Sequence, residues 1–402
     1  MASGLTEFPV RRNTLLLSGA LIGLSGMIQL AVAVATTTLV LVTGVEKILG
    51  LGPAIFLSAA AIAALPAGRA MDRYGRIPVI ALGCVAGIVG TSTTALGCHW
   101  RSGVLVSIGF ALVGASQGMV LLARAAAADM VPPARRPRQI SLVLFGAVAG
   151  AIFGPFVFGP MFSGRELDAG DLVLPWFAAG GFMVVALVLV LLVRPDPRTI
   201  AVALGATGSE PPAAARLGEI LRRPGVLTAL LAAVASFAVM VEIMNLTGYV
   251  MLGHRHEQSD VFPVISVHIV GMYGLILVVG DLIERMGRRN ALVAGLVVMA
   301  ASTLSLVWFQ SVFWTGVSLF GLGLGWSFAY ISATTQLIDL AAPNERGRLI
   351  GFSDQLSAFS GAGLALLHEL DLALQRTRCP GVVDAAARVD VHVVGPVFHV
   401  GL

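Results

Sequence analysis

A charged motif that occurs twice constrains the fold of this chain more than any other feature. Both copies separate two long apolar segments, and matching residues lie 212 positions apart. The first copy is formed by Gly68, Asp72, Arg73, Gly75 and Arg76. The second copy is formed by Gly280, Glu284, Arg285, Gly287 and Arg288. Because duplicated membrane halves with matching hairpins are common in carriers, the repeat predicts two related halves.

A second repeated signature supports the same division. Its members recur 210 positions apart, almost the spacing of the first motif. They are Asp129, Pro133, Arg136, Arg138 and Ile140, followed later by Asp339, Pro343, Arg346, Arg348 and Ile350. Two independent matches at nearly one spacing predict that residues 1–194 and 224–367 are related bundles.

The composition places these bundles in a membrane. The chain is 57% apolar and 12% charged, whereas soluble domains carry about 25% charged residues. No charge occurs for 33 residues between Arg12 and Glu46, and about 20 apolar residues suffice to cross hydrocarbon. Since hydrocarbon offers the backbone no partners, the spans must be helical, and an all-α polytopic membrane protein is predicted. The eleven expected helices are 14–41, 48–68, 78–98, 102–128, 140–163, 172–193, 224–251, 261–282, 290–310, 312–338 and 349–367.

The distribution of positive charge predicts the orientation. With the N-terminus in the cytoplasm, the inner segments hold eighteen arginines and the outer segments only four basic residues. This bias places both motifs on the cytoplasmic side of the cell (inner or plasma) membrane. The net charge of +4 is then a topology signal, and no nucleic-acid partner is expected.

Two segments lie outside the bundles. Residues 195–223 are either a flexible linker or, from Ala213 to Arg223, an amphipathic helix that lays Leu217, Ile220 and Leu221 on lipid. Residues 368–402 contain no apolar run long enough to span, so the second bundle has five helices and an atypical, non-membrane tail. A frameshift or truncation is one hypothesis for this tail. A native-length protein carrying it would refute that hypothesis.

The first motif resembles the helix 2–3 loop motif of the major facilitator superfamily, Gly-x-Leu-x-Asp-Arg-x-Gly-Arg-Arg. Ala70 replaces the leucine and Ile77 the last arginine, and the second copy is similar to the family's weaker repeat. The resemblance covers roughly residues 11–367. It implies two pseudo-symmetric six-helix bundles, here with helix 12 apparently missing, and alternating access to a site between them.

The resemblance also implies roles for the motif residues. Asp72 would face the start of helix 11, where a helix N-terminus carries about half a positive charge. Arg76 would pair with Asp129, and the two contacts would open and close with the halves. Glu284 and Arg288 would do a weaker version of this in the second half. The alternative is a hairpin that only enforces topology.

Of two further motifs of the family, one is largely present in this chain and the other lacks its arginine. Gly150, Gly154, Pro155 and Gly159 are similar to the antiporter motif of drug–proton exporters, with Phe158 at a position expected to be glycine. The family's Arg-x-x-Gln-Gly in helix 4 instead begins at Gly114, so the usual intramembrane arginine is missing. The glycines at 146, 150 and 154 also suit close helix packing without any hinge.

Several polar residues lie at membrane depth. Glu242 is the most informative, because a central acid costs about 2.5–3.5 kcal/mol to insert and should face the interior or water. It is a candidate proton carrier, or an acid bonded to a neighbouring helix. Arg124 either extends to the interface or joins the Asp72–Asp129 cluster. His268 either titrates or is a packing residue. The remaining candidates for substrate contact, or for interhelical bonding, are Gln29, Gln117 and Asn245.

These patterns favour secondary transport of a small organic molecule, with proton-coupled efflux preferred. The alternatives are a nutrient or metabolite symporter, or a transport-dead sensor or scaffold. No phosphate-binding loop and no nucleophile, base and metal set is present, so neither ATP nor enzymatic activity is expected. We expect no cofactor or metal, a proton gradient as energy source, and a monomer whose partners are its substrate, protons and the lipid bilayer.

Overall fold

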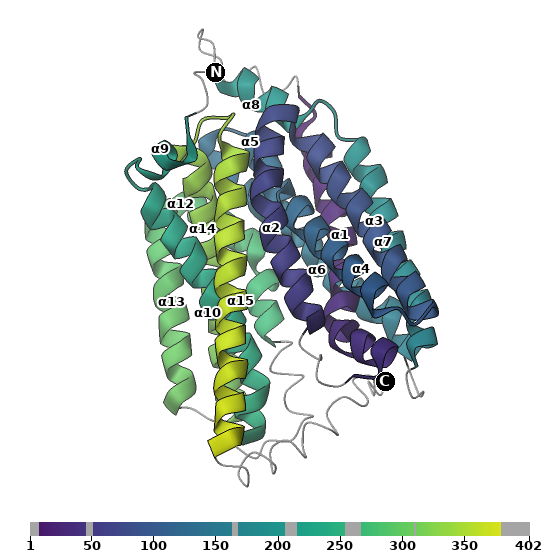
Figure 1. Cartoon of the computed structure of the whole chain (residues 1–402). Coiled ribbons are helices and arrows are strands. Elements are labelled where there is room, and N and C mark those ends of the chain that lie inside the picture. The colour runs from purple at the N-terminus through teal and green to yellow at the C-terminus, as the bar shows by residue number, and fades with distance from the viewer. Residues whose placement is uncertain are drawn as a thin grey trace.

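The computed structural model describes residues 8–45, 51–162, 168–205, 215–253, 267–308 and 311–378. Within these ranges every regular element is a helix, which confirms the predicted all-α class. The helices form two bundles that stand side by side and meet most closely at one end (Figure 1).

The N-terminal bundle contains six spanning segments. Its elements are α1 (Val10–Thr43), α2 (Leu51–Tyr74), α3 (Arg76–His99), α4 (Gly103–Val120), α5 (Ala123–Asp129), η3 (Pro133–Arg135), α6 (Arg136–Phe162), η4 (Ala169–Leu172) and α7 (Val173–Leu191). The predicted helix 102–128 is interrupted between α4 and α5, where Leu121 and Leu122 leave the regular pattern.

The C-terminal bundle contains five spanning segments. Its elements are α10 (Val226–Gly253), the π-helical η5 (Val270–Gly274), α12 (Ile276–Met286), α13 (Arg288–Trp308), α14 (Val312–Leu340) and α15 (Arg346–Arg378). Residues 267–274 and 276–286 bend by 48° at Leu275, so the segment predicted as one helix over 261–282 is broken. Its first residues, 261–266, lie outside the described part.

Length and composition support the predicted spans. Eight described helices are long and apolar enough to cross a membrane, and the bent pair makes a ninth. The two remaining predicted segments correspond to α6 and α15, of 27 and 33 residues. At about 1.5 Å per residue, both exceed the hydrocarbon thickness.

The packing of the helices follows the duplication. Within the bundles α3 packs on α4, and α13 packs on α14 in the matching place. Between the bundles α2 packs on α15, and its counterpart α12 packs on α6. The pair α2 and α15 lie side by side in the middle of Figure 1. The two bundles therefore meet through two symmetry-related helix pairs.

The linker is more structured than either expectation for it. Residues Pro197–Gly205 form α8 and Leu217–Leu221 form α9. Ile220 is fully buried within the protein, so α9 packs on the C-terminal bundle and does not lie on lipid. The expectation of a lipid-facing helix is corrected. The spacing of apolar residues predicts one apolar helix face, but it does not say whether that face meets lipid or protein.

The last helix also differs from the expectation. It begins at Arg346 and continues to Arg378, past the predicted end at residue 367. The added turns are rich in Leu, Ala, Glu, Gln and Arg, which favour helix even where they are polar. The predicted tail beyond residue 378 lies outside the described residues.

Candidate functional site

Both repeated motifs lie at one end of the molecule, which we call the motif end. Each forms a sharp turn between two helices, at Gly75 with φ 103° and at Gly287 with φ 81°. Glycine adopts this backbone region without the steric cost that other residues meet. Helices α8 and α9 are at the same end (Figure 1).

The first copy of the motif docks on the start of α15. The Asp72 carboxylate accepts the N–H groups of Gly347 at 2.8 Å and Arg348 at 2.7 Å. Arg76 Nη1 donates to the same carboxylate at 2.9 Å. A helix N-terminus attracts anions because its first N–H groups have no partners within the helix. This is the placement that the family resemblance implied for Asp72.

Asp129 joins the two halves beside this contact. Arg76 Nη2 lies 2.9 Å from Asp129 Oδ2, and Arg346 Nη1 lies 2.7 Å from Asp129 Oδ1. Arg76 also donates from Nη2 to the Pro343 carbonyl at 2.8 Å. The Asp129 side chain is only 1% exposed, so its pairing with two guanidinium groups is what makes burial of these charges tolerable. We call Asp72, Arg76, Asp129 and Arg346 the first latch.

The second copy makes the corresponding contacts. Asp339 pairs with Arg288 from its own half and with Arg136 from the other half. Arg288 also donates to the Pro133 carbonyl, as Arg76 donates to Pro343. We call Glu284, Arg288, Asp339 and Arg136 the second latch. It is more accessible to water, since the Asp339 side chain is 21% exposed.

One difference between the latches is built into the sequence. The position of Gly347, counted back by 210, is Pro137, which has no N–H. Glu284 therefore has a single backbone donor, Arg138, where Asp72 has two. Glu284 Oε1 is buried and without a hydrogen-bond partner in the described residues.

Small residues let the halves approach closely at the motif end. A Cβ on Gly68 would lie 2.0 Å from the Gly347 carbonyl oxygen, and a Cβ on Gly351 would lie 2.3 Å from that of Ala64. On the other side, a Cβ on Gly280 would meet the Ser141 side chain at 2.5 Å. Glycine at 68 and 280 therefore permits close contact between the bundles.

Sequence reasoning missed Asp196, which holds the first hairpin from the linker side. Its carboxylate accepts the backbone N–H groups of Arg76 and Ile77 at 2.9 Å each and that of Arg198 at 2.8 Å. It thus caps α3, because the N-cap residue Gly75 has no side chain that could do so. A lone acid between two prolines looks like ordinary linker composition, so only its position in space reveals the role.

Glu345 was also missed, and it ties the second half of the linker to the start of α15. Arg223 donates to it at 2.6 and 3.0 Å, and the Ala215 N–H donates at 2.9 Å. Burial alone would raise the pKa of this carboxyl, but hydrogen bonds from Arg223, Ala215 and Ala342 outweigh burial and lower the pKa. Glu345 is therefore a charged anchor at neutral pH.

Arg124 is placed differently from both expectations. It is buried, and Nη2 lies 2.5 Å from Asp354 Oδ1 on α15. Its guanidinium carbon lies 5.0 Å from the centre of the Tyr330 ring on α14, and Tyr330 stacks on Trp326 at 4.7 Å. Arg124 Nη1 also donates to the Leu121 carbonyl in the break after α4, at 3.0 Å. No sequence signal places Asp354 opposite this arginine.

The other membrane-depth candidates stay apart from this pair. Glu242 is half-buried on α10, with Oε2 buried and unpartnered in the described residues. Gln117 has the same property at Oε1, and Gln29 is half-buried on α1. The Asn245 side chain lies outside the described residues. No hydrogen bond or ion pair within the described part connects these side chains with one another.

His268 is a packing residue in the structure. It is fully buried, and Nδ1 lies 2.7 Å from the Leu319 carbonyl oxygen, which requires the proton on Nδ1. Nε2 is then an acceptor, and it has no partner among the described residues.

The glycines of α6 pack against α1. A Cβ on Gly146 would lie 2.1 Å from the Ser18 carbonyl oxygen, and a Cβ on Gly150 would lie 2.5 Å from that of Ile22. The side chain of Phe158 is buried, with its ring 6.0 Å from that of Phe182 on α7. The burial of Gly154, Pro155 and Gly159 lies outside the described part, so only close packing is seen for this motif.

Close packing against α2 explains why position 114 is a glycine. A Cβ at this position would lie 2.0 Å from the Phe56 carbonyl oxygen on α2. Gly118, one turn later, is also close to α2, since a Cβ there would lie 2.5 Å from the Ala60 carbonyl oxygen. The arginine that the resemblance leads one to expect at position 114 has no room in this packing.

The site consists mainly of ion pairs and hydrogen bonds between charged side chains. Over the described ranges no group of three His, Cys, Asp or Glu side chains is placed to hold a metal. What the geometry provides is a set of charged contacts between bundles, all at or near the motif end. Such contacts hold that end closed and can separate if the bundles tilt.

Comparison with known proteins agrees with this architecture. The sequence matches the Major Facilitator Superfamily over residues 15–366. It is 30% identical over 345 residues to an uncharacterized MFS-type transporter, YdeG, of Bacillus subtilis, covering 82% of this chain and 78% of that protein. It is 31% identical over 306 residues to the riboflavin transporter RfnT of Brucella anthropi, covering 73% and 72%.

Solved structures show the same fold at low identity. The human organic anion transporter MFSD10 superposes with a TM-score of 0.70 at 17% identity, over 90% of this chain and 93% of that one. FucP in its outward conformation gives 0.70 at 14% identity, over 92% and 93%. The proteins compared are transporters and not enzymes, and neither is this chain an enzyme. The chain is a multi-pass membrane protein that belongs to the Major Facilitator Superfamily.

Proposed function

We propose that this secondary transporter exports a small organic molecule in exchange for protons, by alternating access between its two bundles. The observation that carries the proposal is the double latch at the motif end, where each half supplies an arginine to an aspartate of the other. Alternating access requires contacts that close one end and break as the halves tilt. The positive-inside bias supports a cytoplasmic location for this end.

Glu242 is the proposed proton carrier. It lies in a span, is half-buried, and has an oxygen with no partner in the described residues. An acid at this depth is expensive unless it faces a polar cavity or is neutralised by a proton. Arg124 and Asp354 form a further charged pair between the halves, and we propose that this pair transmits the change at Glu242 to the first latch.

Proteoliposomes with an imposed pH gradient test this proposal. A lipophilic cation or weak base that accumulates only when protons flow outward from the lumen identifies exchange. Glu242→Gln is expected to abolish gradient-driven transport while leaving substrate exchange at equal pH. Gradient-driven transport that is unchanged in Glu242→Gln would remove this residue from coupling.

A second candidate is uptake or release of a metabolite with a planar aromatic group. It is supported by the relative named as a riboflavin transporter and by the stacked Trp326 and Tyr330 beside Arg124. Stacking on aromatic rings favours flat ligands. Flux of radiolabelled riboflavin into the same proteoliposomes tests it, with Trp326→Leu expected to lower the affinity.

A transport-dead sensor or scaffold is the third candidate. Vesicles that show no flux of any tested substrate, although ligand still changes the stability of the protein, would favour it. Substrate-dependent proton flux would exclude it.

A further inference from the structure

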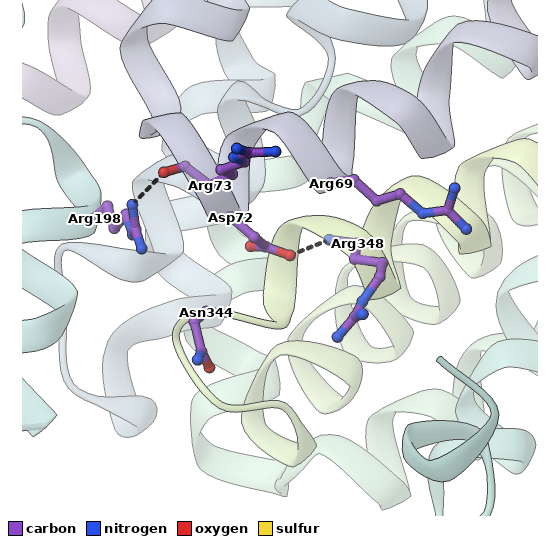
Figure 2. A pocket seen from close by; sticks show the side chains of 6 residues that line it. All are labelled: Arg69, Asp72, Arg73, Arg198, Asn344 and Arg348. Atoms are coloured by element: carbon purple, nitrogen blue, oxygen red, sulfur yellow. Dashed lines mark hydrogen bonds between the residues drawn. The ribbon is translucent and has the colours of Figure 1, made fainter. Parts of the chain in front are cut away.

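A pocket with four arginines lies at the motif end, between α2, α8 and the start of α15 (Figure 2). Its volume is about 290 Å³, near the lower end of the range for small-ligand sites. It is lined by Arg69, Asp72, Arg73, Arg198, Asn344 and Arg348. The lining thus carries four positive charges and one negative charge.

The nearby carboxylates are already occupied. Asp72 accepts from Arg76 and from the N–H groups of Gly347 and Arg348. Asp196, which precedes α8, accepts the backbone N–H groups of the hairpin and of Arg198. Neither acid therefore forms an ion pair with a pocket guanidinium.

Among the described residues, the four arginines have no ion-pair partner. Of the ion pairs in the described part of the chain, none engages Arg69, Arg73, Arg198 or Arg348. Arg198 donates to the Arg73 carbonyl at 2.9 Å, and Arg348 donates to that of Ala215. The Nε of Arg348 is buried and has no partner among the described residues. Guanidinium groups with donors to spare are suited to phosphate oxygens.

The duplicated half shows that this charge excess is not a product of the repeat. The position of Arg69, counted forward by 212, is Asp281, and that of Arg348, counted back by 210, is Arg138. Arg138 and Asp281 form an ion pair at 3.3 Å. At the second latch these two positions thus form a neutral ion pair, whereas at the first latch they are the two cations Arg69 and Arg348.

We propose that this pocket binds a phosphate-bearing anion that bridges Arg69 and Arg73 of the N-terminal half with Arg348 of the C-terminal half. Arg69 and Arg73 occupy the last turns of the span that ends at Tyr74, which is the depth of phospholipid headgroups. The phosphate is supplied by an anionic phospholipid or by a soluble phosphate. Because the anion contacts both halves, it stabilises the closed motif end and shifts the population toward it.

Thermal unfolding of the purified full-length protein in detergent micelles tests the site without any transport assay. Dioleoylphosphatidylglycerol is compared with dioleoylphosphatidylcholine, and sodium phosphate with sodium chloride at equal ionic strength. A rise in Tm with the anionic lipid alone assigns the site to a headgroup, and a rise with inorganic phosphate assigns it to a soluble anion. No rise with either over its control would overturn the proposal.

Arg69→Gln is the informative variant, because Arg69 is exposed and no ion pair within the described residues engages it. We expect about fivefold weaker binding of the stabilising anion, the loss of one basic contact near a membrane surface. Arg285→Gln is the matched control, since Arg285 is an exposed cation at the same end, in the position that corresponds to Arg73. Equal weakening in both variants would indicate general charge attraction and overturn the site. If Arg69→Gln does not fold, Arg73→Gln is compared with the same control.

Discussion

The two latches have the same connections but differ in how they are built. In each, an aspartate at the end of a helix binds one arginine from its own half and one from the other half. The first latch is buried and adds two backbone donors to Asp72, whereas the second is partly exposed and loses a donor to Pro137. Identical topology therefore gives contacts of unequal strength, and the halves are expected to part first at the second latch.

Removal of the buried aspartate should give the largest difference in stability between the two latches. Asp129→Asn leaves Arg76 and Arg346 buried without their shared counter-charge, which is expected to cost about 3–5 kcal/mol of unfolding free energy. Asp339→Asn should cost less, because water reaches Arg288 and Asp339. Denaturant unfolding of both variants measures the difference, and equal losses would show that burial does not separate the latches.

Asp72→Asn tests the backbone donors of the first latch. The variant keeps the shape of the side chain but weakens its bonds to Gly347 and Arg348, each a hydrogen bond to a charged group. A loss of about 1.5–3 kcal/mol is expected, so amide exchange at the start of α15 should accelerate tenfold or more. Glu284→Gln is the matched control, and its effect on exchange at the start of α6 should be smaller. The reverse order would contradict the assignment of the stronger latch.

Pro137→Ala should make the second latch resemble the first. It restores the N–H that corresponds to that of Gly347, so Glu284 gains a second backbone donor worth about 1 kcal/mol. Amide exchange at residues 138–142 is expected to slow, and Glu284→Gln should cost more in this background than in the original one. The double-mutant cycle isolates that coupling. A coupling energy of zero between the two substitutions would mean that the missing N–H at residue 137 does not cause the difference between the latches.

Replacement of Glu345 should give the smallest change in unfolding free energy, and this change should depend on pH. In the other half its position is taken by the exposed Arg135, so only the C-terminal half has this anchor. Because its pKa in the folded protein is lowered, its contribution is fully present above the unfolded value of about 4.5 and is lost as the pH falls through the folded pKa. The difference in unfolding free energy between the original protein and Glu345→Gln should be constant above about pH 5 and shrink below it. It should be about 1 kcal/mol or less, since the Arg223 side chain is 35% exposed and screened by water. A difference that grows toward acidic pH would reverse the assigned sign.

Much of the fold follows from the sequence because its causes are local. Charge-free segments, the two repeats and the arginine distribution are each read along the chain, and they predict the helices and the division into bundles. The contacts of Asp72 and Arg76 were also predictable, through the family resemblance to the motif. The bend at Leu275 and the break after Val120 were not, since both depend on how neighbouring helices pack.

The site residues that were missed depend on rotation and distance. Asp196 and Glu345 are single acids in polar loops, and nothing in their neighbours along the chain shows that they accept backbone N–H groups. Arg124 was expected either to reach the interface or to join the Asp72–Asp129 cluster, whereas its partner Asp354 lies 230 residues away on another bundle. A sequence pattern fixes what a helix can bury, whereas the partner of a buried charge is set by the angle at which two helices face each other.

The contact between Gly114 and the Phe56 carbonyl limits what this position can carry. The backbones of α4 and α2 lie so close that even a methyl group on residue 114 would collide with that carbonyl oxygen. An arginine introduced at position 114 would meet α2 before its side chain could extend, so it would disturb the packing of the N-terminal bundle before it supplied a charge. A residue that couples protons to transport in this chain therefore has to lie at another position.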